Sequence, residues 1–402
     1  MILELLAGLS LAIWIYLVFG RGGYWRAAVQ LEADPPAPAR WPAVTALVPA
    51  RNEAETIGPA VASLLAQDYP GSLRVIVIDD DSDDGTAGAA RAAAEASGAA
   101  DRVTVVAARA LPPDWSGKLW ALDEGLKSIE AINSPYLWLS DADVVHGPSI
   151  LRRLVAKAEA EQRDLVSLMV ALACDGPWGR LLIPAFVYFF QLLYPFPWVA
   201  DPGRREAAAA GGCVLLRRAA LINIGGFAAI REALIDDCAL ARKIKDARLS
   251  PGGIWLGLTR DSRSIRAYKN LFQIWRMVAR NAFAQLRFSP LLLISTLLGL
   301  GFVFLVPPLS LAAWPLGGPA WAAGFGLLAW LLMMLTFRPT LSLYRQPAWL
   351  SALLPLAAAL YGAMTVDSAR RHRAGRGGAW KGRIQAHARP RGGTLAGRRP
   401  DL

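Results

Sequence analysis

Long apolar stretches at both ends of the chain set the strongest limit on its fold. Residues 1–20 carry one charge, Glu4, and are long enough to cross a hydrocarbon core of roughly 30 Å. Three more apolar stretches follow late, at residues 290–314, 319–337 and 347–366. With 54% apolar and 19% charged residues, the chain is too apolar for a wholly soluble protein and too charged for a pure membrane bundle. We therefore expect a water-soluble domain attached to membrane spans.

Charges beside these stretches indicate an orientation. Arg21 and Arg26 follow the first stretch directly, and it has neither a basic start nor a small-residue cleavage site, which favours a span over a signal peptide. Because Lys and Arg are enriched on the cytoplasmic side, we expect the N-terminus outside and the Pro-rich linker, residues 21–42, inside. Arg338 and Arg345 place a later loop inside too. The prediction is a multi-pass protein of the inner (cytoplasmic) membrane with its central domain in the cytoplasm.

The last apolar stretch leaves two alternatives. If residues 347–366 cross fully, the basic tail, residues 367–402, lies outside, against the usual charge bias. Pro355 and flanking arginines are also compatible with a re-entrant or interfacial hairpin. The tail holds ten basic and two acidic residues, so it accounts for eight of the eleven net positive charges. Since the remainder is nearly balanced, the charge does not indicate a nucleic-acid partner.

A fifth apolar stretch, residues 181–199, lies inside the central domain. Its three prolines and its aromatic residues fit a segment at the membrane interface, where amphipathic rings lie at headgroup depth. A buried core element is the alternative.

The central region, residues 43–288, has the pattern of one α/β domain. Short β-type runs alternate with Ala-rich helical stretches, one of them at residues 86–96. The β-type runs are residues 43–48, which end at Pro49, 73–78, 103–107, 136–139 and 213–216. Strand–helix alternation predicts a largely parallel sheet, and such sheets bind ligands at the carboxyl ends of their strands.

Acidic residues gather where two of these strands end. Asp79 to Asp84 include five aspartates and follow the second run, and Asp141 and Asp143 follow the fourth. Clustered carboxylates repel one another, so a cation or hydrogen-bond donors must compensate them. An Asp-x-Asp triplet suits Mg²⁺ or Mn²⁺ bridging to a nucleotide diphosphate, although an isolated triplet is more often a solvated turn.

Taken together, the motifs resemble inverting family 2 glycosyltransferases in order and spacing. They are Val48 to Glu53, Asp79 to Thr86, Ser116-Gly117-Lys118, Asp141-Ala142-Asp143, Gly211-Gly212 and Asp236 to Leu240. The spans and the closing Trp380-Lys381-Gly382-Arg383 most resemble the hopene-associated branch of that family. The resemblance implies a GT-A fold, the Rossmann-like nucleotide-diphospho-sugar transferase fold, flanked by transmembrane helices. It also implies a UDP-sugar donor, a divalent metal (Mg²⁺ or Mn²⁺) and a lipid-like acceptor.

The resemblance further implies roles for individual residues. Asp143 and Asp141 would face the metal, with Asp143 as the more direct ligand. Asp237 would be the general base for the acceptor hydroxyl, supported by Asp236. The implied donor-binding residues are Pro49, Ala50, Arg51, Glu53, Asp80, which would contact the uracil, Lys118, Asp141, Gly212 and Arg276.

The leading hypothesis is transfer of one sugar to an amphipathic lipid such as a hopanoid, with two alternatives. A processive polysaccharide synthase would carry Gln-x-x-Arg-Trp, where this chain has Gln273-Ile274-Trp275-Arg276-Met277. A non-catalytic membrane scaffold would be expected to have lost some of the motif acids. Arg276 is either a diphosphate ligand or part of a basic amphipathic helix, residues 265–287, lying on the inner leaflet.

Overall fold

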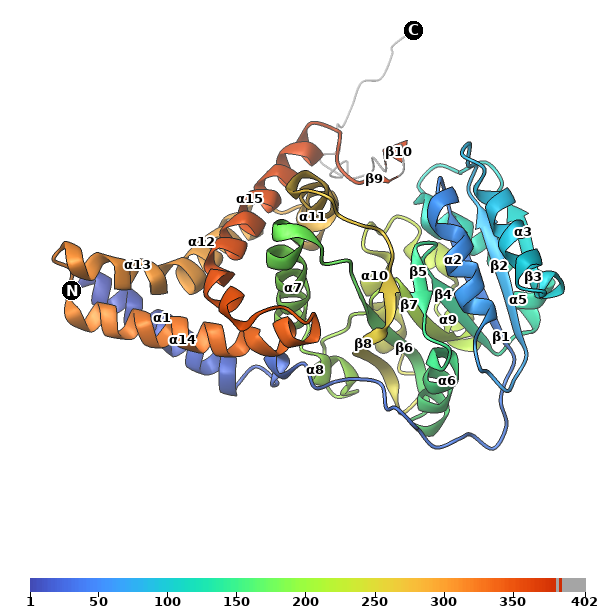
Figure 1. Ribbon diagram of the computed structural model, residues 1–402, viewed down its shortest axis with the longest axis horizontal. Coiled ribbons are helices and arrows are strands. Elements are labelled where there is room, and N and C mark those ends of the chain that lie inside the picture. Colours follow the sequence, from blue (N-terminus) through green and yellow to red (C-terminus); the bar gives the residue numbers. More distant parts are fainter. Residues whose placement is uncertain (381–382, 385–402) are drawn as a thin grey trace, which may run out of the picture.

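The computed structural model describes residues 1–380 and 383–384. An α/β domain forms one end of the molecule and an arm of apolar helices the other, with the N-terminus at the tip of the arm (Figure 1). Residues 381–382 of the closing motif lie outside the described residues, and so do residues 385–402 of the basic tail.

The domain is built on an eight-stranded sheet in the order β3-β2-β1-β4-β7-β6-β8-β5. The strands are β1 (Val44–Ala50), β2 (Leu73–Asp79), β3 (Val103–Ala107), β4 (Tyr136–Ser140), β5 (Val144–His146), β6 (Arg163–Ala171), β7 (Cys213–Arg217) and β8 (Gly253–Ser264). Strands β3, β2, β1 and β4 are parallel, whereas β7 runs antiparallel to both β4 and β6. A short pair, β9 (Ala379–Trp380) and β10 (Arg383–Ile384), stands apart.

Strand β1 continues beyond the predicted end at Pro49. Its pairing with β4 stops at Leu47, whereas its pairing with β2 continues to Ala50. Pro49 therefore has a strand neighbour on one side only, and a proline, which lacks an N–H, is tolerated where one side of a strand is unpaired.

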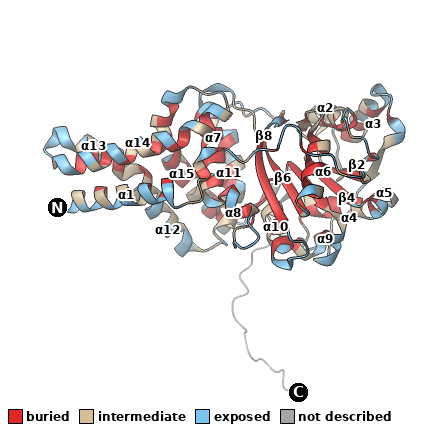
Figure 2. Ribbon diagram, turned by 90° about the horizontal axis from the view of Figure 1, so that it is seen from below, coloured by how far each residue is buried: buried red, intermediate tan, exposed pale blue. Residues whose placement is uncertain are grey.

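Helices cover both faces of the sheet, because alternate residues of the central strands point to opposite sides. Ile76 and Ile78 of β2 enter one apolar core, and Val75 and Val77 enter the other. All four are fully buried, as expected for a strand of a parallel sheet covered on both faces (Figure 2). The helices of the domain are α2 (Ala54–Leu65), α3 (Thr86–Ala96), α4 (Gly117–Leu126), α5 (Ile129–Asn133), α6 (Ile150–Ala160), α9 (Arg218–Asn223) and α10 (Asp236–Ala247).

Four helical segments in the described chain are long and apolar enough to cross a membrane, and they coincide with the four predicted stretches. They are α1 (Ile2–Phe19), the bent segment Pro290–Leu316, α14 (Ala320–Leu343) and the segment Ala348–Arg373. The bent segment contains α12 (Pro290–Leu300), a π-helical turn and α13 (Val306–Ala313). The last segment opens with a 3₁₀ turn, Ala348–Leu353, before α15 (Leu354–Arg373).

These helices fall into two groups. Helix α14 packs along α1 and α13, and these three form the arm, with the turn between α13 and α14 at its tip (Figure 1). Helix α15 instead packs mainly on α11 (Leu271–Gln285), close to the α/β domain.

The apolar segment inside the domain folds as α7 (Gly176–Leu193) and α8 (Phe196–Ala200), separated at Pro195. Half of the residues of α7 are buried. Five of them lie in an apolar cluster shared with α1, α14 and α15, namely Leu181, Leu182, Ile183, Ala185 and Tyr188. The hydroxyl of Tyr188 lies 2.8 Å from the hydroxyls of both Tyr24 and Thr336. Helix α7 therefore joins the arm to the domain, and its buried face fits the alternative of a core element.

Candidate active site

The first part of the site forms where β1 and β2 end side by side. Asp80 is buried directly after β2, and its N–H donates to the carbonyl of Ala50 over 2.8 Å. Arg51 donates to the backbone carbonyls of Asp80 and Asp81 and lies 3.6 Å from the Asp81 carboxylate. Arg51 thus closes the aspartate-rich turn, and the predicted residues Ala50, Arg51 and Asp80 lie together.

The turn after β1 is fastened to the loop after β2. Asn52, in a left-handed conformation with φ of 51°, donates its N–H to Ser82 over 3.0 Å. The N–H of Glu53 donates to Thr86, and the N–H of Ala54 donates to the Asp84 carboxylate. Helix α2 has no capping side chain of its own, so the second loop supplies acceptors for its first N–H groups.

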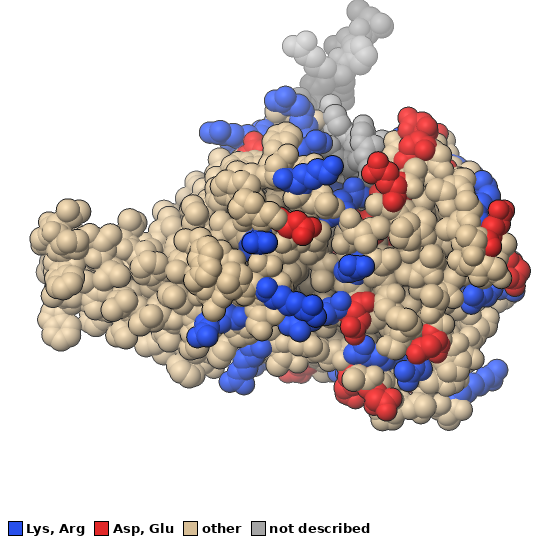
Figure 3. Space-filling model, in the orientation of Figure 1, with Lys and Arg blue, Asp and Glu red and all other residues tan. Residues whose placement is uncertain are grey.

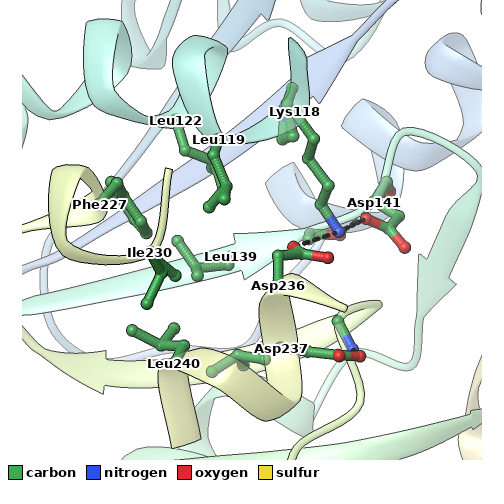
Figure 4. Close-up of a pocket in the computed structure, with 14 residues that line it drawn as sticks. Lys118, Leu119, Leu122, Leu139, Asp141, Phe227, Ile230, Asp236, Asp237 and Leu240 are labelled. Carbon is green, nitrogen blue, oxygen red and sulfur yellow. Dashed lines mark hydrogen bonds and ion pairs between the residues drawn. The ribbon is translucent and has the colours of Figure 1, made fainter. Parts of the chain in front are cut away.

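Lys118 connects two acidic segments that are distant in the sequence. It lies in the first turn of α4, and its Nζ is 2.8 Å from Asp141 and 3.4 Å from Asp236 (Figure 4). Although burial opposes its charge, the carboxylates of Asp141 and Asp236 raise the pKa of Lys118. A permanent cation therefore links the Asp-x-Asp triplet to the start of α10.

Asp237 lies at the start of α10, and two backbone N–H groups hold its carboxylate. One carboxylate oxygen accepts from Gly211 over 2.8 Å and the other from Cys238 over 2.7 Å. Burial, together with the neighbouring Asp236 carboxylate, raises the pKa of Asp237 to about 6, while Lys118 opposes the shift. Asp237 can therefore take up a proton near neutral pH.

Gly211, rather than Gly212, makes the close approach to these acids. A Cβ at Gly211 would lie 3.1 Å from the Lys118 Nζ and 3.3 Å from the Asp237 carboxylate. A Cβ at Gly212 would instead meet Val170 at 3.0 Å, within the apolar core. The pocket around Lys118, which Pro49 also lines, encloses only about 10 Å³, roughly one water molecule. Apolar side chains such as Leu119, Phe227 and Leu240 fill its other half (Figure 4).

Arg266 was not predicted as a site residue. Its Nε donates to Asp143 Oδ2 over 2.9 Å, and its second nitrogen pairs with Glu53. Ser264 donates to the same Asp143 oxygen over 3.0 Å. Arg266 therefore joins the turn after β1 to the Asp-x-Asp triplet. The sequence offered no local signal for this role, because the stretch before Arg266, Thr259–Ser264, is polar and has no apolar alternation.

The two aspartates of the triplet offer oxygens of the right chemistry for a divalent cation. Asp141 Oδ2 and Asp143 Oδ1 accept no hydrogen bond among the described residues, whereas the other oxygen of each carboxylate contacts Lys118 or Arg266. Burial and the nearby Asp143 carboxylate raise the pKa of Asp141 against the opposing charge of Lys118. A cation would relieve this repulsion, so the pair fits Mg²⁺ or Mn²⁺.

Other ligands for a metal are not gathered here. No group of three His, Cys, Asp or Glu side chains converges within the part of the chain that the structure describes. His146 is buried, and its two ring nitrogens lie 2.9 Å from the hydroxyls of Ser140 and Ser262. Burial lowers the pKa of His146 to about 3, so it is a neutral core residue.

Arg276 lies on the exposed face of α11, with its guanidinium 5.7 Å from the ring of Phe272. Within the described residues no ion pair joins it to the acids of the site. The opposite face of α11 buries Ile274 and Val278, and Trp275 donates to Asp367 of α15 over 2.8 Å. These contacts fit the alternative of an amphipathic helix.

A family model described as "Glycosyltransferase like family 2" matches residues 42–250, just over half of the chain. The chain belongs to this family. The matched region contains the motifs from the turn after β1 to Asp237, but not Arg266 or Arg276. The expected family and the α/β fold of the GT-A type are thereby confirmed.

Individual relatives of this family 2 chain are distant. An N-acetylglucosaminyltransferase of Mesorhizobium japonicum is 27% identical over 204 residues, which are 48% of this chain and 43% of the relative. The chain thus matches less than half the length of this curated relative.

Solved structures of glycosyltransferases resemble the chain at low identity. One is a mannosyltransferase from Pyrobaculum calidifontis in complex with GDP-Man and Mn²⁺, with 20% identity, 92% of this chain and 98% of that chain covered, and a TM-score of 0.49. Another is glucosyl-3-phosphoglycerate synthase from Mycobacterium tuberculosis in complex with Mg²⁺ and UDP. Its identity to this chain is 21%, the match covers 61% of this chain and 79% of that chain, and the TM-score is 0.41.

Proposed function

We propose that the protein is a membrane-bound inverting glycosyltransferase of the hopene-associated branch. It transfers one sugar from a UDP-sugar to a hydroxyl of a lipid-like acceptor such as a hopanoid. The observation that carries this proposal is the single cluster formed by Asp237, Asp236, Lys118 and Asp141. Family membership adds the reaction class, because all four residues lie within the matched region, residues 42–250.

Asp237 acts as the general base in this reaction. The acceptor oxygen bonds to the anomeric carbon of the sugar as the bond from that carbon to the UDP oxygen breaks, so the configuration inverts. The hydroxyl proton passes to Asp237 and the electron pair leaves with UDP. With a pKa of about 6, Asp237 is mostly ionised at neutral pH, yet it binds a proton more readily than an exposed aspartate.

The donor lies along the edge formed by Ala50, Arg51 and Asp80, which bind the nucleoside. Asp143 and Asp141 would hold Mg²⁺ or Mn²⁺ through their carboxylates, and such a metal would supply positive charge against the departing diphosphate. Lys118 adds a second positive charge beside the same phosphates and holds Asp141 in place.

The apolar arm anchors this reaction at the inner membrane, with the catalytic domain in the cytoplasm. Helix α7 connects the arm to the domain, and its C-terminal end lies close to the base. Tyr194, which directly follows α7, packs against the same apolar cluster as Cys238, the neighbour of Asp237. An acceptor that arrives along α7 from the membrane would therefore reach Asp237.

The test uses the purified full chain with Mn²⁺, a membrane-lipid extract and a panel of nucleotide sugars. We expect UDP release that depends on the lipid, and a lipid product heavier by one sugar in mass spectrometry. If no nucleotide sugar releases its nucleotide, the proposal fails. A ladder of products with many sugars would instead support a polysaccharide synthase.

A further inference from the structure

An open cavity of about 670 Å³ lies where the arm meets the α/β domain, away from the acids of the candidate active site. The end of α14 and the turn that follows it form one wall, and β8 contributes the other through Arg260. Its charged lining residues are Arg260, Arg338 and Arg345, and none of its lining residues is acidic. Three guanidinium groups thus face one space without a lining carboxylate.

Arg260 has a structural role in this junction. Its guanidinium donates to the carbonyl of Leu343 over 2.9 Å and to that of Ser342 over 2.7 Å. Both carbonyls belong to the last turn of α14, where backbone acceptors have no partner within the helix. Arg260 therefore fastens the domain to the arm and fixes the geometry of the cavity.

Arg338 and Arg345 differ from Arg260, because their guanidinium groups donate no hydrogen bond within the described residues. Both side chains are exposed, and neither has a hydrogen bond or an ion pair with any residue in the described ranges 1–380 and 383–384. A guanidinium presents several N–H donors in a planar fork that matches phosphate oxygens. Two such groups around one cavity form a site for a phosphate-bearing anion.

The position of the cavity along α14 indicates where that anion comes from. Leu331 and Leu335 of α14 are 49% and 46% exposed, and Arg338 follows Leu335 by about 4.5 Å along the helix axis. Trp349, 65% exposed, stands on the 3₁₀ turn just beyond. Exposed apolar side chains followed by arginines and a tryptophan mark the boundary between hydrocarbon and headgroups. On the face that Figure 3 shows, the arm presents no charged side chain, and Lys and Arg gather where it joins the domain.

We propose that this cavity binds the phosphate-bearing headgroup of an anionic membrane lipid, which then links the domain to the bilayer. The cavity has the size of a small-molecule pocket and can hold a glycerophosphate headgroup. Arg338 and Arg345 pair with the phosphate, Gln346 offers an amide, and Trp349 lies beside the acyl chains. This inference depends on insertion of the arm in a membrane, but not on the identity of the sugar or of its acceptor.

The experiment measures lipid binding by the full chain in neutral detergent, using native mass spectrometry with phosphatidylglycerol or phosphatidylcholine as the probe. We expect the wild type to retain phosphatidylglycerol preferentially. The double variant Arg338→Gln/Arg345→Gln should bind it more weakly by about fivefold for each arginine removed. The variant Arg338→Lys/Arg345→Lys keeps both positive charges, so its binding of phosphatidylglycerol should weaken less than that of the double glutamine variant. Arg91→Gln, which removes an exposed arginine on α3, is the matched control and should bind like the wild type.

Several results would overturn the proposal. One is equal retention of the two lipids by the wild type, and another is unchanged phosphatidylglycerol binding by the folded double glutamine variant. Displacement of the lipid by inorganic phosphate at similar concentration would assign the cavity to a soluble anion instead. Sugar transfer is measured separately, so an inactive enzyme that still shows arginine-dependent lipid binding would contradict the proposed function alone.

Discussion

Burial and the Asp236 carboxylate hold the pKa of Asp237 near 6, whereas an exposed aspartate titrates near 4. Asp237→Asn keeps the shape of the side chain but cannot accept the acceptor proton. We expect kcat to fall by about 10² to 10⁴ with little change in donor affinity. Asp246→Asn is the matched control, because Asp246 lies on the same helix and, among the residues that the structure describes, pairs only with Arg242, at 3.8 Å. Equal losses in the two variants would remove Asp237 from the chemistry.

The raised pKa of Asp237 also predicts a pH profile. The base works only when it is ionised, and it becomes protonated as the pH falls below its pKa. We therefore expect kcat to decline by about tenfold per pH unit below pH 6, once denaturation is excluded by recovery of activity on return to neutral pH. If kcat instead fell only around pH 4, an exposed carboxylate, and not Asp237, would be the base.

Arg266 places a permanent charge between Asp143 and Glu53, where it competes with any metal for Asp143. Arg266→Gln removes that charge, so Mn²⁺ should bind about tenfold more tightly, roughly 1.4 kcal/mol, in calorimetric titration without a donor. Arg263→Gln, which removes an exposed charge from β8, should leave the affinity unchanged. Weaker binding in Arg266→Gln would show that Arg266 positions Asp143 for the metal instead of competing with it.

At the scale of elements, local patterns were the most predictable part of the fold. Helix α3 begins at Thr86 and ends at Ala96 as the Ala-rich stretch indicates, and β2 extends its predicted run by one residue. The second half of β8, Thr259–Ser264, is polar and has no apolar alternation. It becomes a strand through pairing with β5, which no local pattern indicates.

The parts of the site that could be predicted are likewise those that depend on local sequence, and not on contacts between distant segments. Asp141 and Asp237 could be located because their motifs are short and contiguous. The contact between Arg266 and Glu53 joins residues 213 positions apart, and it depends on where β8 lies in a mixed sheet. Neither the spacing nor the family motifs carries that information.

The loop after β2 caps α2, and this capping should contribute to stability. Asp84→Ala removes the acceptor for the N–H of Ala54 and should cost about 1 kcal/mol, lowering Tm by about 2 °C. Thr86 and the backbone N–H groups lower the pKa of Asp84 despite some burial. The contribution is therefore present above about pH 4 and is lost as the pH falls through the lower folded pKa. Asp83→Ala, in the same loop, should change Tm less in thermal unfolding at neutral pH. Equal Tm values for wild type and Asp84→Ala would contradict the capping role.

At the scale of the whole molecule, the arrangement of the apolar helices indicates on which side of the membrane the basic tail lies. The arm contains α1, α13 and α14, with the N-terminus and the turn near Leu316 at its tip. Helix α15 packs on α11 beside the domain, and its last turn holds Arg370, Arg371 and Arg373. An α15 that lies at the interface would leave the tail on the same side as the active site, in agreement with the bias of basic residues toward the cytoplasm.

This arrangement predicts the labelling of single cysteines by an impermeant maleimide in intact cells. Leu316 is 87% exposed at the tip, so Leu316→Cys should react from outside. Ala374→Cys, just after α15, should react only once the membrane is permeabilised. The parent protein, whose Cys213 is buried and whose Cys174 and Cys238 are partly buried, supplies the background. Labelling of Ala374→Cys in intact cells would mean that α15 crosses the bilayer and carries the basic tail to the outside, because a span would separate the tail from the domain.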